Sequence, residues 1–379
     1  MTEIARAELP DPFRCQDGTR VCTLAQWQRR RQEVRDLIVA LEYGGLPPTP
    51  TEIRWEELPT GSVEHIGSAR FVSGRVNTGQ DRPFSFLLNL LIPPGSGPFP
   101  VVLNGDACWP YVTEAVVAQV LRRGNILAQF NREEIVPDAP RSEPAAGLYR
   151  VFPETSFGAL AAWAWGYHRC IDVLAGMDFV DVSRIAVVGH SRGGKAVLLA
   201  GATDERIALT NANNSGAGGA GCYRWQGAGS ETLADLIRVF PYWFGPRLKE
   251  CINRENELPF DQHFLKSLIA PRSLLTTEAL GDLWANPTGT WQTHLAAREV
   301  YRFLGVEERI GIWFRDGQHD HGNADWKAFF DFMDWQFRGQ EPAERFDRNP
   351  HSEQRSAFSW KAPGVAADMN GEPAGSGDA

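Results

Sequence analysis

One pentapeptide, Gly189-His190-Ser191-Arg192-Gly193, constrains the fold of this chain more than any other feature, and it fits the pattern G-x-S-x-G. An apolar run at residues 184–188 precedes it, and a helix-forming run at residues 195–200 follows it. A strand, a tight turn and a helix in this order are typical of a nucleophile elbow, in which the turn lifts a serine hydroxyl out of a sheet. Glycines two residues to either side allow a turn too tight for a side chain at those points. We therefore predict that Ser191 is a catalytic nucleophile.

The residues around the elbow alternate between strand and helix patterns. Strands are expected at 99–104, 125–130, 184–188, 207–211, 272–278 and 309–314, and helices at 112–123, 156–177, 261–269, 291–304 and 325–338. Such alternation favours a mostly parallel sheet with helices on both faces. Earlier patterns at 51–58, 64–76 and 84–92 alternate apolar and polar residues, as antiparallel strands do. The predicted fold class is α/β, an α/β-hydrolase three-layer sandwich with a mostly parallel central sheet and an antiparallel N-terminal part.

The chain divides into three predicted parts. Residues 1–50 form a lead-in with a helix at 24–43 that packs on the main domain, and residues 51–340 form the catalytic domain. Residues 341–379 form a C-terminal extension whose last part, 364–379, is expected to be disordered because it lacks apolar periodicity. Within the catalytic domain, residues 131–156 form a long loop, and residues from about 212 to 262 are expected to be irregular.

A serine hydroxyl needs a histidine that takes its proton and a carboxylate that orients the histidine. In this fold the partners follow the serine in the order acid, then histidine. His319 lies on the predicted loop between the last strand and the closing helix, and it is the preferred base, with His321 as the alternative. Asp282 follows the 272–278 strand and is the preferred acid, with Glu278 as the alternative.

Composition excludes several other classes of function. The formal net charge is −9 and the pI is near 5.5, so no basic excess is present to neutralise nucleic-acid phosphates. No stretch approaches the roughly 18–20 apolar residues that span a bilayer. The first residues carry no signal-peptide pattern, which predicts a cytoplasmic protein as the sequence stands, or an exported one whose leader has been removed. No cofactor is expected, and no cluster of ligand residues indicates a metal.

Several motifs together resemble one family, the bacterial glucuronoyl esterases of carbohydrate esterase family fifteen. The matching segments, in chain order, are AAWAWG at 161–166, GHSRGGK at 189–195, NNSGAGGA at 213–220, LPFDQH at 258–263, LIAPR at 268–272 and DLWA at 282–285. The resemblance covers roughly residues 8–340. It implies an α/β-hydrolase fold, a Ser-His-acid triad and hydrolysis of glucuronic acid esters.

The resemblance also implies roles for individual residues. Ser191 is the nucleophile, His319 the base and Arg192 an oxyanion-stabilising residue, and a guanidinium or backbone N–H at that place would indeed lower the barrier. Lys195 matches a lysine that contacts sugar hydroxyls, and Trp284 lies near the position of a sugar-stacking tryptophan.

The sequence departs from the family pattern at two places. Some members carry a glutamate triad acid where this chain has Asn214, which assigns the acid role to Asp282, as in other bacterial members. The Gln and Glu that bind sugar hydroxyls in fungal members are not recognisable around residues 238–244.

The predicted function is a serine carboxylic-ester hydrolase that cleaves esters of (4-O-methyl-)glucuronic acid through an acyl-enzyme. The partner is a small-molecule or carbohydrate ester, with no nucleic acid and no membrane. The alternative is an esterase of the same fold that acts on an acetylated carbohydrate or a small aryl or alkyl ester. A non-catalytic binding module of this fold is disfavoured because Ser191, Asp282 and His319 are all present.

Overall fold

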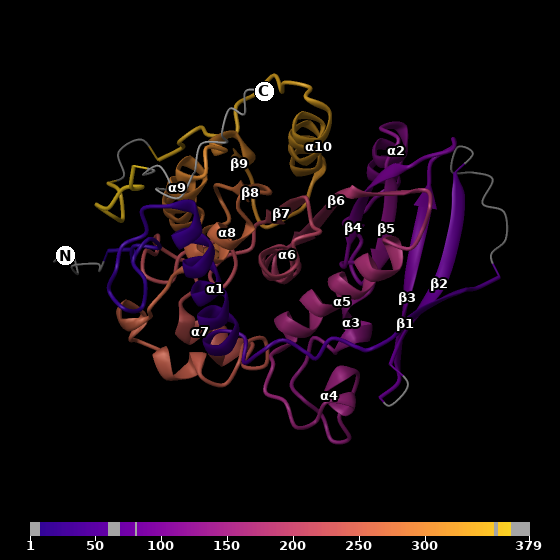
Figure 1. Cartoon of the computed structure of the whole chain (residues 1–379), viewed down its shortest axis with the longest axis horizontal. Helices are drawn as coiled ribbons and strands as arrows, with labels where there is room; N and C mark the ends of the chain where they lie inside the picture. The colour runs from indigo at the N-terminus through magenta and orange to yellow at the C-terminus, as the bar shows by residue number, and fades with distance from the viewer. Residues whose placement is uncertain (1–7, 60–68, 80–81, 352–354, 365–379) are drawn as a thin grey trace, which may run out of the picture.

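The computed structural model describes residues 8–59, 69–79, 82–351 and 355–364. Within these residues nine strands form one twisted sheet in the order β1-β2-β3-β5-β4-β6-β7-β8-β9 (Figure 1). The strands are β1 (Ile53–Glu57), β2 (Arg70–Thr78), β3 (Phe84–Ile92), β4 (Phe99–Asn104), β5 (Ile126–Phe130), β6 (Val180–His190), β7 (Leu209–Asn213), β8 (Ser273–Ala279) and β9 (Ile310–Arg315).

The sheet is antiparallel at one end and parallel across the rest. β1 pairs with β2, β2 with β3 and β3 with β5 in antiparallel register, whereas the pairs from β5 through β4 to β9 are all parallel. The predicted antiparallel N-terminal part and parallel remainder are therefore confirmed. Because β4 to β9 run in one direction, their carboxyl ends meet at a single edge of the sheet.

Helices cover both faces of the sheet and complete a three-layer sandwich. Val101 and Val187 face one core, which contains α5 (Ala159–Leu174), α6 (Arg192–Thr203) and α8 (Gln262–Ile269). Val102 and Val188, their neighbours in sequence, face a second core under α2 (Glu114–Arg122) and α10 (Asn323–Arg338). Strands buried on both faces read as continuous apolar runs, which is why these strands were recognisable in the sequence.

The N-terminal helix α1 (Leu24–Leu41) packs on the main body, as predicted. Its start is fixed by a capping box, in which Thr23 accepts from the backbone N–H of Gln26 and the Gln26 side chain returns to the Thr23 backbone. Trp27, Val34 and Ile38 are buried on one face of the helix, and α1 contacts α8.

Two stretches that were expected to be irregular contain short helices, so that expectation was wrong. Residues 131–156 hold α3 (Arg132–Ile135) and α4 (Leu148–Val151), each a single turn and too short to give a periodic pattern. Residues 212–262 hold α7 (Leu233–Val239), η1 (Leu248–Cys251) and η2 (Glu255–Glu257). The start of α7 is a capping box between Thr232 and Asp235 that the sequence reading overlooked.

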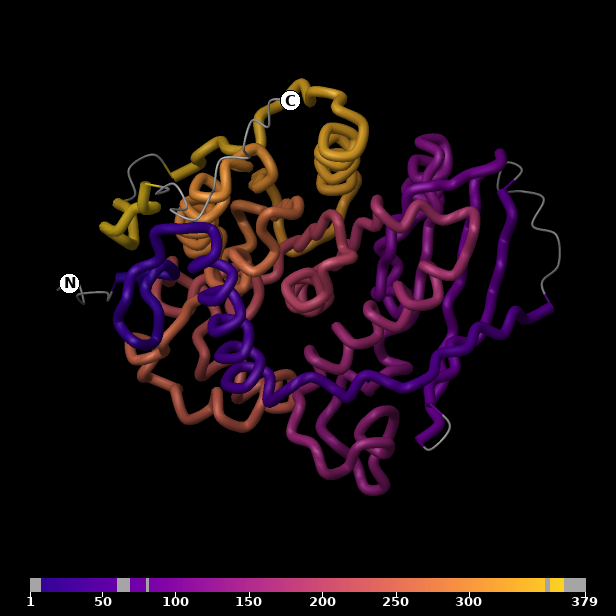
Figure 2. The backbone as a smooth tube through the Cα atoms, viewed as in Figure 1, coloured from indigo at the N-terminus to yellow at the C-terminus, as the bar shows by residue number. Residues whose placement is uncertain are grey.

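The C-terminal residues that the structure describes lie beside the N-terminal ones, as Figure 2 shows at the indigo and yellow ends of the tube. The Leu9 N–H donates to the Ala357 carbonyl at 2.9 Å, and Phe358 is buried in a small core with Leu9. The Ala357 N–H donates to the Gln292 side chain on α9 (Pro287–Phe303). Residues 365–379, most of the predicted disordered tail, lie outside the described residues.

Gly189 gives a test of the tight turn. A Cβ on Gly189 would lie well inside van der Waals contact of the Gly193 carbonyl group, which belongs to backbone and cannot swing away. We expect Gly189→Ala to lower the free energy of unfolding by about 1–3 kcal/mol or more, measured by urea denaturation. The control is Gly176→Ala, where the nearest atom would be the Val173 carbonyl oxygen at an ordinary 3.5 Å. Equal stability of the two variants would contradict the tight approach.

Candidate active site

Ser191 lies between β6 and α6 in a backbone conformation that a residue with a side chain avoids. Its φ is 55° and its ψ is −121°. Such a conformation costs of order 1–3 kcal/mol and persists only where neighbouring structure imposes it. The Ser191 N–H donates to the Asn213 carbonyl at the end of β7 at 2.8 Å, and the side chain stays partly exposed. The predicted elbow is therefore present, at the carboxyl edge of the parallel strands.

His319 lies on the loop between β9 and α10, beside the elbow. Its Nδ1 is 2.5 Å from Asp282 Oδ2, and its ring centroid is 4.5 Å from that of His190, the residue before Ser191. The His319 side chain is 43% exposed, whereas that of Asp282 is 5% exposed. A carboxylate on Nδ1 fixes the tautomer in which Nδ1 carries the proton, so Nε2 is free to accept one. The structure thus pairs His319 with Asp282 and brings this pair next to His190, the residue before Ser191.

His321, the alternative base, occupies a packing position. It is buried, and its ring stacks on Trp326 of α10 at a centroid distance of 4.5 Å and an interplanar angle of 9°. Neither ring nitrogen has a hydrogen-bond partner among the described residues. Burial, with help from the charges of His190 and Arg315, lowers the pKa of His321 well below its ordinary value. A base needs an orienting partner, which His319 has and His321 lacks.

Glu278, the alternative acid, is fully buried near the end of β8. The pKa of Glu278 is well above its ordinary value, mainly because of burial and secondly because of the charge of Asp282. Asp282 Oδ2 lies 2.5 Å from His319 Nδ1, so the geometry favours Asp282 as the acid.

The guanidinium of Arg192 is held in place by a cluster from two distant loops. Nη1 of Arg192 donates to Asp138 Oδ2 at 2.6 Å, and Asp138 Oδ1 accepts from Tyr242 Oη and Trp243 Nε1, each at 3.0 Å. The Arg192 Cζ lies 4.8 Å from the centre of the Trp243 ring and 4.9 Å from that of Phe240, and the two rings stack at 3.7 Å. The Arg192 backbone N–H is the first of α6 and has no acceptor within the helix. The Arg192 backbone N–H next to Ser191 is therefore not used within the helix, and its guanidinium is held by Asp138 and the two rings.

Lys195 lies one turn into α6 and is fully buried. Its Nζ donates to the carbonyls of Ser215 (2.6 Å) and Ala217 (2.5 Å) and to Glu231 Oε1 (3.1 Å). Burial lowers the pKa of Lys195 and raises that of Glu231, while the attraction between the two groups opposes both shifts. Lys195 is thus tied to an acidic partner that the sequence analysis missed.

Glu231 lies just before α7, inside the stretch that was expected to be irregular. No motif marks it, since a lone acid before a capping box is common on protein surfaces. Its backbone N–H donates to the Trp284 carbonyl at 3.1 Å. Burial raises the pKa of Glu231, and a hydrogen bond from the Trp284 side chain is among the contacts that oppose this rise. Trp284, on η3 (Leu283–Ala285) directly after Asp282, is 46% exposed. Lys195, Glu231 and Trp284 therefore form one group beside the triad.

Neither a metal centre nor a membrane-crossing helix is found in the part of the chain that the structure describes. No three His, Cys, Asp or Glu side chains there converge as ligands, and no helix there has the length and apolar character that a bilayer requires.

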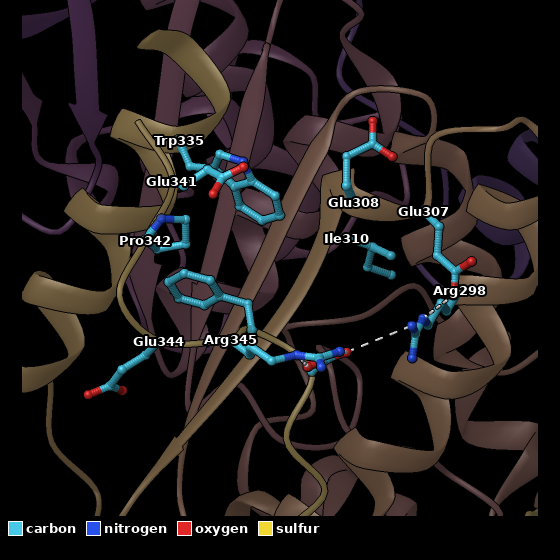
Figure 3. Close-up of a pocket in the computed structure, with 11 residues that line it drawn as sticks. Arg298, Glu307, Glu308, Ile310, Trp335, Glu341, Pro342, Glu344 and Arg345 are labelled. Carbon is cyan, nitrogen blue, oxygen red and sulfur yellow. Dashed lines mark hydrogen bonds and ion pairs between the residues drawn. The ribbon is translucent and has the colours of Figure 1, made fainter. Parts of the chain in front are cut away.

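A pocket of about 390 Å³ lies at the amino end of β9, away from the catalytic edge (Figure 3). Arg298 pairs there with Glu307, and Arg345 with Asp347. Glu308, Glu341 and Glu344 also line it, and none of the predicted site residues does.

Comparison with known proteins agrees with the geometry. Residues 76–305 match the family described as "Glucuronyl esterase, fungi". The 4-O-methyl-glucuronoyl methylesterase of Podospora anserina is 33% identical over 315 residues, which are 80% of this chain and 62% of that protein. The chain thus spans slightly less than two thirds of that relative. Carbohydrate esterase MZ0003, from an unknown prokaryotic organism, is 31% identical over 89% of this chain and 91% of its own length.

Among solved structures, a carbohydrate esterase family 15 glucuronoyl esterase from Caldicellulosiruptor kristjansonii superposes with a TM-score of 0.82. It is 31% identical, and the match covers 96% of this chain and 99% of the other. The family expected from the sequence motifs, and the α/β-hydrolase fold that goes with it, are therefore confirmed. This chain belongs to the glucuronoyl esterases of carbohydrate esterase family 15, which are carboxylic ester hydrolases.

Proposed function

We propose that this protein hydrolyses esters of 4-O-methyl-glucuronic acid, with Ser191 as nucleophile, His319 as base and Asp282 as acid. The observation that carries the proposal is the 2.5 Å contact between His319 Nδ1 and Asp282 Oδ2 beside a strained elbow serine. The names of relatives support the substrate class, since the Podospora protein is a 4-O-methyl-glucuronoyl methylesterase.

The first half of the reaction forms an acyl-enzyme. Ser191 Oγ attacks the ester carbonyl carbon while His319 Nε2 takes the hydroxyl proton, and Asp282 stabilises the imidazolium that results. The carbonyl oxygen becomes an oxyanion that the Arg192 backbone N–H and guanidinium stabilise. When the tetrahedral intermediate collapses, the C–O bond to the alcohol breaks and His319 returns the proton to the leaving oxygen.

The second half releases the uronic acid. A water molecule loses a proton to His319 Nε2 and attacks the acyl carbon, and the second tetrahedral intermediate expels Ser191 Oγ. The proton passes back to the serine, so the enzyme is regenerated and one water is consumed for each ester cleaved.

Glu231 and Trp284 are proposed to bind the sugar ring, with Lys195 holding Glu231 in place. The three donors of Lys195 are taken by Ser215, Ala217 and Glu231. Glu231 offers a carboxylate acceptor and Trp284 a partly exposed aromatic face. Vicinal hydroxyls both donate and accept hydrogen bonds, and a sugar face packs well on an indole. This set fits a pyranose better than it fits a simple alkyl chain.

A second candidate is an esterase with broader or different specificity, such as one that cleaves acetylated carbohydrates or small aryl esters. The match with MZ0003, which is named only as a carbohydrate esterase and is covered over 91% of its length, favours this reading.

Substrate choice separates the two candidates. Methyl and benzyl glucuronate, acetylated xylan and p-nitrophenyl acetate would be offered to the purified protein, with Ser191→Ala as the blank. We expect cleavage of the uronate esters and none in the blank. Cleavage of p-nitrophenyl acetate or acetylated xylan alone would exclude the uronate ester as substrate and leave the second candidate.

The two histidines are expected to respond differently to substitution. His319→Ala and Asp282→Asn should each lower kcat on the order of 10³- to 10⁴-fold, because the proton acceptor or its orienting anion is lost. His321→Phe keeps the stacking on Trp326 and removes nitrogens that bind nothing in the described residues, so kcat should change little. A large loss in His321→Phe with full activity in His319→Ala would show that the base is His321.

The Lys195–Glu231 pair is expected to matter for both stability and substrate binding. Lys195→Met or Glu231→Gln alone leaves a buried charge without its partner, and each should lower the free energy of unfolding by about 3–5 kcal/mol. The free energy of unfolding of the double variant should fall by less than the sum of the two single losses. KM for methyl glucuronate should rise in the double variant, while p-nitrophenyl acetate hydrolysis should be much less affected.

The matched control is Lys327→Met, which removes an exposed pair with Asp331 and should change neither quantity appreciably. Additive losses in the Lys195 and Glu231 variants would mean that the two groups do not depend on one another.

A further inference from the structure

The side chain of Asn214 joins the two segments that carry the base and the acid. Asn214 follows β7, and its Nδ2 donates to the Asp320 carbonyl at 2.9 Å, next to His319. Its Oδ1 accepts from the Ala279 N–H at 2.7 Å, three residues before Asp282. One buried amide thus connects the histidine loop with the end of β8.

The chemistry of the position requires an amide. One end must donate, because it meets a carbonyl oxygen, and the other must accept, because it meets an N–H. A carboxylate could satisfy Ala279 but would place a negative charge against the Asp320 carbonyl. The backbone at Asn214 has a φ of 41°, a left-handed value that Asn and Asp adopt more readily than other residues with side chains.

Arg315, the last residue of β9, fastens the same loop from the other side. Its Nη2 donates to the carbonyls of Asp320 (2.8 Å) and Gln318 (3.2 Å), which flank His319 in the sequence. Its Nε donates to Asp325 of α10 at 2.8 Å, and this ion pair is largely buried. The backbone on both sides of His319 is therefore held, and the Asp320 carbonyl receives two donors.

We propose that Asn214 is a positioning residue for the catalytic histidine. Together with Arg315 it holds the Asp320 carbonyl, so that His319 Nδ1 remains directed at Asp282 while the imidazole gains and loses its proton. Some family members are expected to carry the triad acid at this position. In this chain Asn214 contributes no charge there and instead holds the backbone next to His319 through hydrogen bonds. This inference rests on the proposed roles of Ser191, His319 and Asp282.

The sharpest test is Asn214→Asp. Aspartate keeps the shape, the tolerance of a left-handed backbone and the acceptor for Ala279, and it removes the donor to Asp320. We expect kcat on methyl glucuronate to fall on the order of 10- to 100-fold with KM little changed, because misplacement of a catalytic group slows the chemical step more than it weakens binding. Asn253→Asp, at an exposed asparagine with a φ of 60°, is the matched control and should leave kcat unchanged.

A second variant and a second readout separate positioning from folding. Asn214→Gly accepts the left-handed backbone without strain but leaves the buried Ala279 N–H without its acceptor, so it should melt below the wild-type temperature and should lose kcat even at temperatures where it is fully folded. The rate at which diisopropyl fluorophosphate modifies the active serine is the second readout, because it requires the triad and no sugar. It should fall by a similar factor in both variants.

Wild-type kcat and wild-type labelling rates in both Asn214 variants would overturn the inference. A loss of kcat that is fully explained by a smaller folded fraction, measured from the melting curve or from the fraction of protein that can be labelled, would also overturn the inference. It would mean that Asn214 has a purely structural role. If the wild-type protein cleaved no uronate ester but reacted with the fluorophosphate, the substrate assignment would fail. The labelling rates of the Asn214 variants would still decide the role of the amide.

Discussion

The backbone at Ser191 is held at a φ of 55° and a ψ of −121°, and most of the surrounding structure serves to keep it there. Without support, a residue that has a Cβ would relax out of this region and release of order 1–3 kcal/mol. The Asn213 carbonyl accepts the Ser191 N–H, and Asp106 Oδ2 accepts the N–H of His190 at 2.9 Å. The hydrogen bonds of these two consecutive N–H groups thus anchor the start of the turn to β7 and to the loop after β4.

Charged side chains are buried next to the elbow, and each would lower the stability of the fold if it had no partner of opposite charge. Asp106 is buried, and its other oxygen forms an ion pair with the buried Arg132 of α3. Lys195, one turn beyond Ser191, is paired with Glu231 in the same way. An isolated buried charge would be destabilising by several kcal/mol, so each partner is needed to keep the other in place. The elbow therefore depends on residues from α3 and from the segment before α7, both far from it in the sequence.

The parts of the site that could be predicted are those with local patterns. The elbow has a motif, the parallel strands read as apolar runs, and the chain order of acid and histidine follows from the fold, so Ser191, Asp282 and His319 were all named from the sequence. The contact between His319 and Asp282 supports His319 over His321 as the proposed base, and no spacing in the sequence could supply that contact. Periodicity also could not locate α3 and α4, because four residues span little more than one turn and cannot show a repeating pattern.

The parts that escaped prediction are those whose chemistry depends on a partner distant in the sequence. The role of Glu231 depends on its contact with the buried Lys195, from which it is separated by 36 positions in the sequence. Asp138 lies in a long loop with no motif, yet its two oxygens bind three side chains, including Arg192. In each case a side chain that looks like an ordinary surface acid is buried by contacts between loops, and such contacts leave no pattern in a single sequence.

The pairing of Arg192 with Asp138 bears on how an arginine can stabilise an oxyanion at this elbow. A free guanidinium on a flexible side chain would be hydrated and would have to reorganise when charge develops on the substrate. Asp138 occupies Nη1, and the stacked rings of Phe240 and Trp243 support the guanidinium plane, so the group is already oriented before the ester arrives. In the proposed reaction, the N–H groups of Arg192 that Asp138 does not bind would stabilise the oxyanion, and donors that are fixed beforehand lower a barrier more than donors that must move. In the same proposed reaction, the ester carries no charge at the reacting carboxyl, and the partial neutralisation of Arg192 by Asp138 weakens its attraction for the carboxylate of the uronic acid product, which favours release of that product.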